Sequence, residues 1–132
     1  SSPIYPDYAR RVAAAAAERE YVHLERDVAR ARIDRLLATH RYGLNCKPGE
    51  HFGMAVAEYV AAGMVAFAPD AGGQREVLAG RTDRLFDPDS TADAVATVAA
   101  AVAADARPTL PRDRYASDRF HAAIRDDVAA VL

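Results

Sequence analysis

The stretch that decides the fold is Gly63-Met64-Val65-Ala66-Phe67-Ala68-Pro69. Its five central residues are all apolar, and a glycine and a proline bound them. A continuous apolar run of this length is typical of a strand that is buried on both faces, as strands of parallel sheets are. We therefore predict a strand over residues 64–68 in the interior of an α/β domain.

Helical and strand patterns alternate before this run. An alanine-rich helix is predicted over residues 7–19, and the alternation in Tyr21-Val22-His23-Leu24 predicts a short strand. The next helix runs from Val28 to about His40, with Asp27 as its N-cap. A strand over residues 42–46 and a helix over residues 53–62 lead to the central run, where Gly63 ends the helix.

The alternation continues after the run. A turn over residues 70–73 is followed by a short helix and a brief strand over residues 84–86. Ser90 or Thr91 caps the next helix, whose apolar face is predicted to be Val95, Val98 and Val102. A last helix is predicted from one apolar stripe: Phe120, Ile124, Val128 and Val131.

This order of elements predicts one α/β domain over residues 1–132. Alternating helices and strands favour a Rossmann-like open parallel sheet that is flanked by helices, with right-handed crossovers. In such sheets a ligand lies beyond the carboxyl ends of the strands. We therefore expect the loops at residues 25–28, 46–53 and 69–74 to converge on one site.

Composition excludes several classes of protein. A net charge of −2 over 132 residues argues against nucleic acid as a partner. Cys46 is the single cysteine, so no internal disulfide can form, and the four histidines have no metal-ligand spacing. No apolar run reaches the length of a membrane span. We expect a cytoplasmic chain that needs no metal or cofactor.

Gly53 is predicted to start the helix over residues 53–62, and this start is a candidate anion site. The backbone N–H groups of Gly53, Met54 and Ala55 precede the first intrahelical bonds, and the helix dipole favours an anion beside them. A diphosphate could dock there, because a glycine lets it approach the backbone closely. The alternative is an ordinary helix start.

Three further features point to the same edge of the sheet. Glu58 lies one turn after Met54 and leans toward the helix start. Its carboxylate could accept hydrogen bonds there from two ribose hydroxyls. Glu50 precedes the helix and could stabilise positive charge at a sugar carbon. The amides of Gly72-Gly73 could contact a sugar or a phosphate. The alternatives are a solvent-facing glutamate, a capping acid and a tight turn, respectively.

Residues 50–58 resemble a known signature. Glu50-His51-Phe52-Gly53-Met54-Ala55-Val56-Ala57-Glu58 is similar to the E-x-F-G-x-x-x-x-E motif of family 4 retaining glycosyltransferases, which have the two-domain GT-B fold. The resemblance continues through Asp70–Val77 and Gly80–Pro88 and covers roughly residues 20–105. The segments 49–54 and 61–63 look most like α-1,2-mannosyltransferases that extend lipid-linked oligosaccharides from GDP-mannose.

The resemblance implies a role for each site residue. Glu58 would hold the nucleotide ribose, and the amides of Gly53 and Met54 would hold the diphosphate. Glu50 would act on the transferred sugar, as the catalytic residue. The loop Arg26-Asp27-Val28 would contact the base. The remaining residues expected to line the site of the nucleotide-sugar donor are Phe52, Ala55, Gly72 and Gly73.

The resemblance also implies what the chain lacks. The family's donor domain opens with a strand and a helix that carry an Arg and a Lys, and this sequence starts after them. We expect the truncated C-terminal half of a GT-B fold, which would need an N-terminal acceptor domain or a partner chain to transfer a hexose. The complete protein could associate peripherally with a membrane. The alternatives are a catalytically silent binding or assembly module and a sugar-nucleotide epimerase-like domain.

Overall fold

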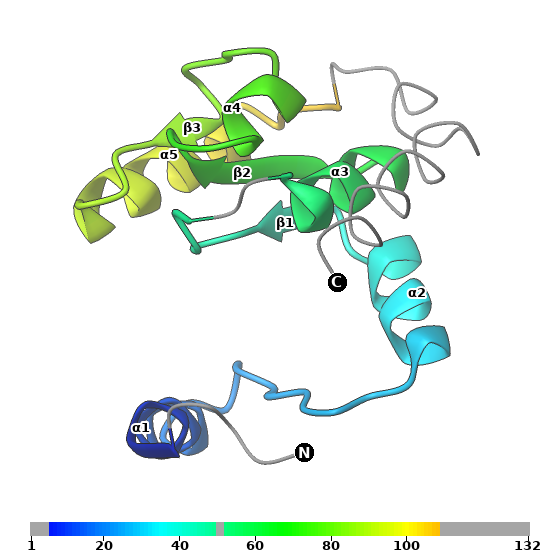
Figure 1. Ribbon diagram of the computed structural model, residues 1–132, viewed down its shortest axis with the longest axis vertical. Coiled ribbons are helices and arrows are strands. Elements are labelled where there is room, and N and C mark those ends of the chain that lie inside the picture. The colour runs from blue at the N-terminus through cyan, green and yellow to red at the C-terminus, as the bar shows by residue number, and fades with distance from the viewer. Residues whose placement is uncertain (1–5, 50–51, 109–132) are drawn as a thin grey trace, which may run out of the picture. The chain divides into compact units, whose positions relative to one another are not determined.

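The computed structural model describes residues 6–49 and 52–108 (Figure 1). The chain divides into two compact units, residues 1–35 and 36–132. The sheet and its three covering helices all belong to the second unit. The expected single domain over residues 1–132 stays a prediction.

The first unit contains helix α1 (Pro6–Ala17). This confirms the alanine-rich helix, although none of its residues is buried. The strand predicted over Tyr21–Leu24 is wrong, because the chain turns there and the Val22 N–H donates to the Arg19 carbonyl. The side chains of Tyr21, Val22 and Leu24 are exposed. Alternation alone does not make a strand when no neighbouring strand pairs with it.

Helix α2 (Arg30–Thr39) crosses the boundary between the units and begins later than predicted. The Ala29 carbonyl accepts the first hydrogen bonds, from the N–H groups of Arg32 and Ile33. Asp27 is therefore not the N-cap. Its backbone is left-handed, with φ 49°, whereas an N-cap residue normally adopts an extended conformation. Aspartate tolerates the left-handed region better than most residues do.

Three strands form the sheet of the second unit. They are β1 (Tyr42–Leu44), β2 (Val65–Pro69) and β3 (Leu85–Phe86). All pairs are parallel and the order is β1-β2-β3, with Tyr42 opposite Val65 and Ala68 opposite Leu85. All five residues of β2 are buried. The predicted mixed α/β fold with an open parallel sheet and a fully buried central strand is thus confirmed.

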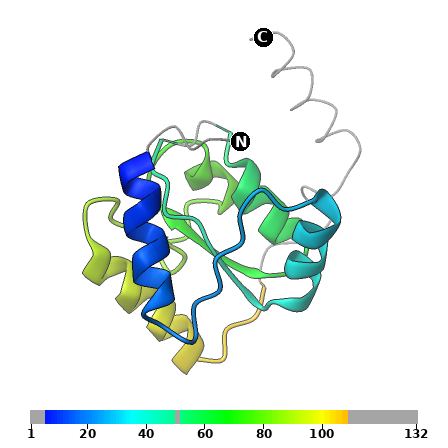
Figure 2. The ribbon, with the colours of Figure 1, turned by 90° about the horizontal axis from the view of Figure 1, so that it is seen from below.

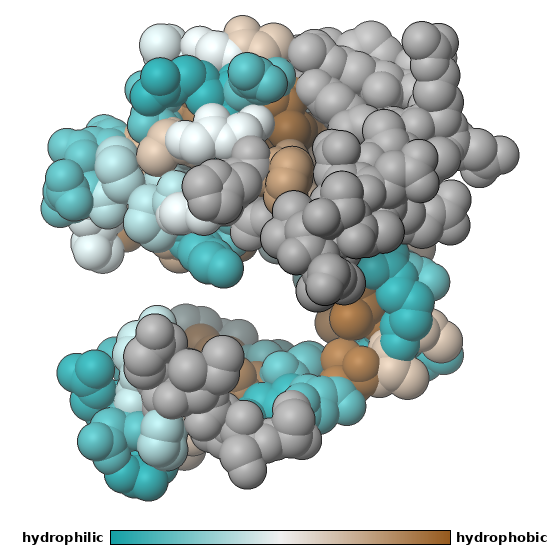
Figure 3. Space-filling view, viewed as in Figure 1, coloured by the Kyte–Doolittle hydropathy of each residue, from teal (hydrophilic) through white to brown (hydrophobic). Residues whose placement is uncertain are grey.

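Alternate residues of β2 face two different helical layers. Ala66 and Ala68 pack with α3 (Met54–Ala61) and α4 (Gln74–Val77). Val65 and Phe67 pack with α5 (Thr91–Ala103) on the other face. Figure 2 shows α3 and α5 on opposite sides of the strands. In Figure 3, hydrophilic and neutral residues dominate the described surface of this unit, as expected when its apolar side chains gather in two interior clusters.

The cap of α5 is Ser90, whose Oγ accepts a hydrogen bond from the Asp93 N–H at 3.0 Å. The predicted apolar face of this helix is confirmed at Val98 and is wrong at its other two residues. Val95 and Val102 are 63% and 50% exposed. The residues of α5 that pack on the sheet are Ala94, Val98 and Ala101. Ala94 and Ala101 are small, so the helix can pack closely over the rings of Phe67 and Phe86.

The last predicted helix, with Phe120, Ile124, Val128 and Val131, lies outside the described residues. Over residues 6–49 and 52–108, no helix combines the length and the apolar character needed to cross a membrane.

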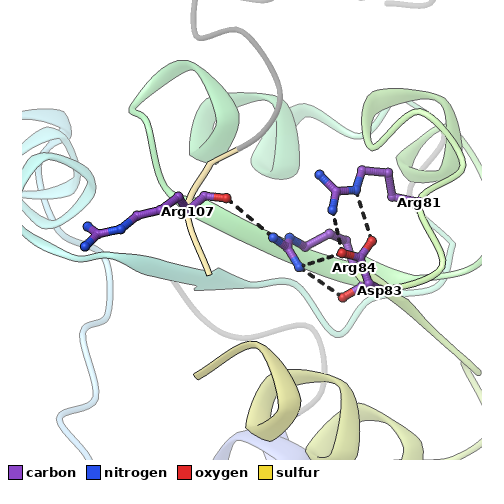
Figure 4. A network of polar contacts seen from close by, with 4 residues as sticks. All are labelled: Arg81, Asp83, Arg84 and Arg107. Carbon is purple, nitrogen blue, oxygen red and sulfur yellow. Dashed lines mark hydrogen bonds and ion pairs between the residues drawn. The ribbon is translucent and has the colours of Figure 1, made fainter. Parts of the chain in front are cut away.

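A buried arginine lies at the amino-terminal end of β3. Arg84 is 6% exposed, and its guanidinium lies 5.7 Å from the centre of the Phe67 ring. Figure 4 shows its contacts, a 3.1 Å ion pair with Asp83 and a 3.5 Å hydrogen bond to the Arg107 carbonyl. Arg81 also pairs with Asp83, at 2.5 Å. The cluster thus keeps a buried cation paired, which avoids most of the cost of burying it.

The Asp83 carboxylate should make stability fall in acid. Its pKa is lowered mainly by hydrogen bonds from Arg81, burial opposes this effect, and the charges of Arg84 and Arg81 lower the pKa further. Because the folded pKa is depressed, this stabilisation is present above the unfolded value of about 3.9 and is lost as pH falls through the folded pKa. Its side chain is half exposed, so we expect about 0–1 kcal/mol.

Urea unfolding of Asp83→Asn between pH 6 and about pH 3 tests this expectation. The variant should be less stable than the parent near pH 6 and should converge with it at the acid end. Asp89→Asn, which removes an exposed carboxylate outside the cluster, should run parallel to the parent. Equal pH slopes for the parent and Asp83→Asn would contradict the role of the cluster.

Candidate functional site

The candidate site begins at the start of α3, on the carboxyl side of β1. Gly53 is the N-cap and has a left-handed backbone, with φ 64° and ψ 32°. The first intrahelical bond runs from the Ala57 N–H to the Gly53 carbonyl, at 2.8 Å. The N–H groups of Met54, Ala55 and Val56 precede that bond, at the end of the helix that attracts an anion.

Gly53 also has a packing reason to be glycine. It is buried, and a Cβ there would lie 2.9 Å from Val77 Cγ2 and 3.3 Å from the backbone of Gln74. Both neighbours belong to α4. A side chain would therefore meet α4, in addition to the strain that a left-handed φ imposes on any residue with a Cβ. The lack of a side chain at Gly53 lets the start of α3 lie against α4. The sequence interpretation did not anticipate this contact.

The other predicted residues of α3 differ in exposure. Phe52 and Met54 are 43% and 39% exposed, and Ala55 and Glu58 are half-buried. Glu58 follows Met54 by four residues within one helix, so the two lie on the same face one turn apart. Helical side chains lean toward the N-terminus, which directs the Glu58 carboxylate toward the helix start.

Tyr59 anchors α3 on β1 next to these residues. A Cβ on Gly43 would lie 2.6 Å from Tyr59 Cγ, so the tyrosine ring rests directly on the strand backbone at a glycine. Burial raises the pKa of the Tyr59 hydroxyl, and the nearby charges of Glu58 and Cys46 raise it further. Tyr59 is therefore neutral at physiological pH and serves to pack α3 on the sheet. Cys46 is exposed in the loop that follows β1.

The turn after β2 supplies the second part of the site. Gly72 is exposed and left-handed, with φ 64°, and Gly73 is the N-cap of α4. Arg75 holds Asp70, the first residue of the turn, because its Nε lies 2.7 Å from Asp70 Oδ1 and its Nη2 donates to the Asp70 carbonyl. A tight turn thus accounts for Gly72, while the exposed backbone stays open to a ligand.

Two polar residues that the sequence interpretation missed join the loops. The Asn45 side-chain amide donates to Gln74 Oε1, and Gln74 Nε2 donates to the Lys47 carbonyl at 3.0 Å. The loop after β1 is thereby tied to the start of α4. A usable signal was available, because Asn45 directly follows a strand and Gln74 opens a helix at the sheet edge where ligands bind.

The structure therefore brings together two of the three expected loops. Residues 46–49 and 52–53 lie beside the turn at residues 70–73 through the contacts of Gln74 and Gly53. Arg26, Asp27 and Val28, predicted to contact the base, belong to the other compact unit. The predicted catalytic residue, Glu50, lies outside the described residues.

An open depression of about 410 Å³ lies beside β3. Its lining is partly acidic: Asp70, Thr82, Leu85, Phe86, Asp87, Pro88 and Asp93. These carboxylates hold their own loops, because Asp93 Oδ2 accepts from the Asp87 N–H at 2.7 Å and Asp87 Oδ1 from the Asp89 N–H at 2.9 Å. The part of the chain that the structure describes contains no group of three or more carboxylate, histidine or cysteine side chains placed to hold a metal ion.

Comparison with protein-family models, with curated proteins and with solved structures finds no match to this chain.

Proposed function

We propose that this chain is the donor-binding domain of a retaining glycosyltransferase with a GT-B fold. Its Rossmann-like sheet would bind a nucleoside diphosphate sugar at the carboxyl edge of β1 and β2. The complete enzyme would transfer a hexose, with mannose favoured by the narrower sequence resemblance, to a hydroxyl acceptor. In the family that the chain resembles, a second domain binds the acceptor.

The observation that carries the proposal is the position of Glu58 on the helix that starts at Gly53. The helix that starts at Gly53 offers amides and a dipole to a diphosphate, and Glu58 lies one turn further along. In a nucleoside diphosphate the ribose adjoins the diphosphate, and in dinucleotide-binding folds an acidic residue holds ribose hydroxyls. Amides and a carboxylate about one helical turn apart therefore match the two neighbouring parts of one ligand.

The chemistry proposed for the site follows from the charge that develops at the sugar. Departure of the diphosphate leaves the transition state with oxocarbenium character at the anomeric carbon. The α3 amides would stabilise the leaving diphosphate, and the Glu50 carboxylate would stabilise the positive sugar. The resemblance implies that no metal takes part, so the protein's own dipoles and charges would carry this work.

Calorimetric titration of the 132-residue chain with GDP-mannose, UDP-glucose and ADP-glucose tests the proposal. We expect saturable binding of at least one of the three at millimolar concentration, because helix-start amides and Glu58 contact groups common to all nucleoside diphosphates. Free mannose and glucose should give no signal, since the sugar alone lacks the diphosphate and the ribose. No binding of any nucleotide sugar would sink the proposal.

A further inference from the structure

Gln74 is the most completely buried polar side chain near the candidate site. Its exposure is 0%, and both polar atoms of its amide are satisfied, the oxygen by Asn45 and the nitrogen by the Lys47 carbonyl. Amides are costly to bury unless they are hydrogen-bonded. A glutamine at this position is thus tied to two defined partners, whereas a leucine or methionine would fill the space without them.

The partners of Gln74 connect the two loops of the candidate site. Asn45 and Lys47 belong to the segment that leaves β1, and the Asn45 N–H is fixed to the Phe67 carbonyl of β2 at 3.0 Å. The Lys47 N–H in turn donates to Asn45 Oδ1, at 3.4 Å. Gln74 itself immediately follows Gly72-Gly73. One amide therefore fixes the loop after β1 to the glycine turn after β2.

Gln74 also borders the start of α3. Its backbone N and Cα would lie 3.3 Å from a Cβ on Gly53. Gly53, at the helix start proposed to bind the diphosphate, therefore packs against Gln74. Gln74 is also the residue that directly follows Gly72-Gly73. Movement of Gln74 would change the separation between Gly53 and Gly72-Gly73.

We propose that Gln74 is a positioning residue for the donor. It holds the Gly72-Gly73 turn at a fixed separation from the α3 start, so that one nucleotide sugar spans both, with its diphosphate at α3 and its sugar at the turn. Gln74 acts through these backbone groups and does not touch the donor. This inference rests on the proposed function, and it assigns sugar contact to the turn and diphosphate contact to α3.

The ratio of two affinities separates positioning from general destabilisation. GDP needs only the α3 start, whereas GDP-mannose needs the α3 start and the turn. Gln74→Leu, which removes both hydrogen bonds, should weaken GDP-mannose binding by about tenfold more than it weakens GDP binding, since misplaced contacts lose much of their effect. Gln74→Glu keeps the acceptor for Asn45 but sets a carboxylate oxygen against the Lys47 carbonyl, so it should change the ratio in the same direction. The UDP-glucose and UDP pair gives the same comparison for a different base.

Val98→Ala is the matched control, because it removes packing on the α5 face of the sheet and leaves the loops intact. It should lower stability without changing the ratio. Amide hydrogen exchange of the ligand-free chain gives a second readout: exchange at residues 71–74 should rise in Gln74→Leu and stay at the parent level in Val98→Ala.

The outcomes are distinct. A ratio that is unchanged in both Gln74 variants, while the parent binds nucleotide, would overturn the positioning role and leave the proposed function standing. If the parent binds neither GDP nor UDP, the proposed function and this inference both fall.

Discussion

Phe67→Ala is expected to destabilise the sheet-bearing unit by about 3–5 kcal/mol, which is a large part of the 5–15 kcal/mol that typically holds a domain together. Phe67 has no exposed surface and packs under α5 beside Phe86 and Ala101. Its ring also stacks with Tyr42, at 6.4 Å between centroids, and covers the guanidinium of the buried Arg84. Truncation therefore leaves a cavity and removes a cation–π contact together.

Urea unfolding followed by circular dichroism measures this effect, with Val95→Ala as the control. Val95 is 63% exposed on α5, so its truncation should change the free energy of unfolding by no more than about 0.5 kcal/mol. The two variants separate the observed packing of α5 from the sequence-predicted face that included Val95. Comparable losses in both variants would mean that α5 packs on the sheet through a different face.

Glu58→Gln is expected to weaken nucleotide-sugar binding by about ten- to a hundredfold. The glutamine keeps the shape of the side chain and removes the charge, and hydrogen bonds to charged groups contribute about 1.5–3 kcal/mol. Glu58 is half-buried on a short helix, so the fold should survive this isosteric change.

Titration calorimetry of the parent and Glu58→Gln with GDP-mannose measures the loss. Asp83→Asn provides the control, because it also removes one carboxylate but lies at the amino-terminal edge of the sheet, away from the α3 start. Equal affinities of the parent and Glu58→Gln would remove Glu58 from the site.

Patterns that depend on backbone periodicity and on burial could be predicted from the sequence. The apolar run that became β2 is buried at every position, as its composition requires. Helix α3 also begins and ends within one residue of the prediction, because glycines flank it on both sides. The parallel direction of the strands follows from the alternation of helices and strands.

Features that depend on tertiary contacts could not be predicted in this way. On α5 both valines and alanines satisfy a helical period, and the period does not fix the rotation of the helix that places Ala94, Val98 and Ala101 on the sheet. The Asn45–Gln74 contact joins residues 29 positions apart, and no periodic pattern encodes a pair of this kind. At Gly53 the same residue serves the helix start and the contact with α4, so its sequence position alone could not separate the two reasons.

The most direct test of donor binding combines Glu58→Gln with removal of the ribose hydroxyls. GDP and its 2′,3′-dideoxy analogue are titrated into the parent and into the variant, giving four affinities in one cycle. If Glu58 holds the ribose, the parent should bind GDP at least about tenfold more tightly than the dideoxy analogue, and Glu58→Gln should bind the two with nearly equal, low affinity. A preference for GDP that persists undiminished in Glu58→Gln would contradict the assignment of Glu58 to the ribose.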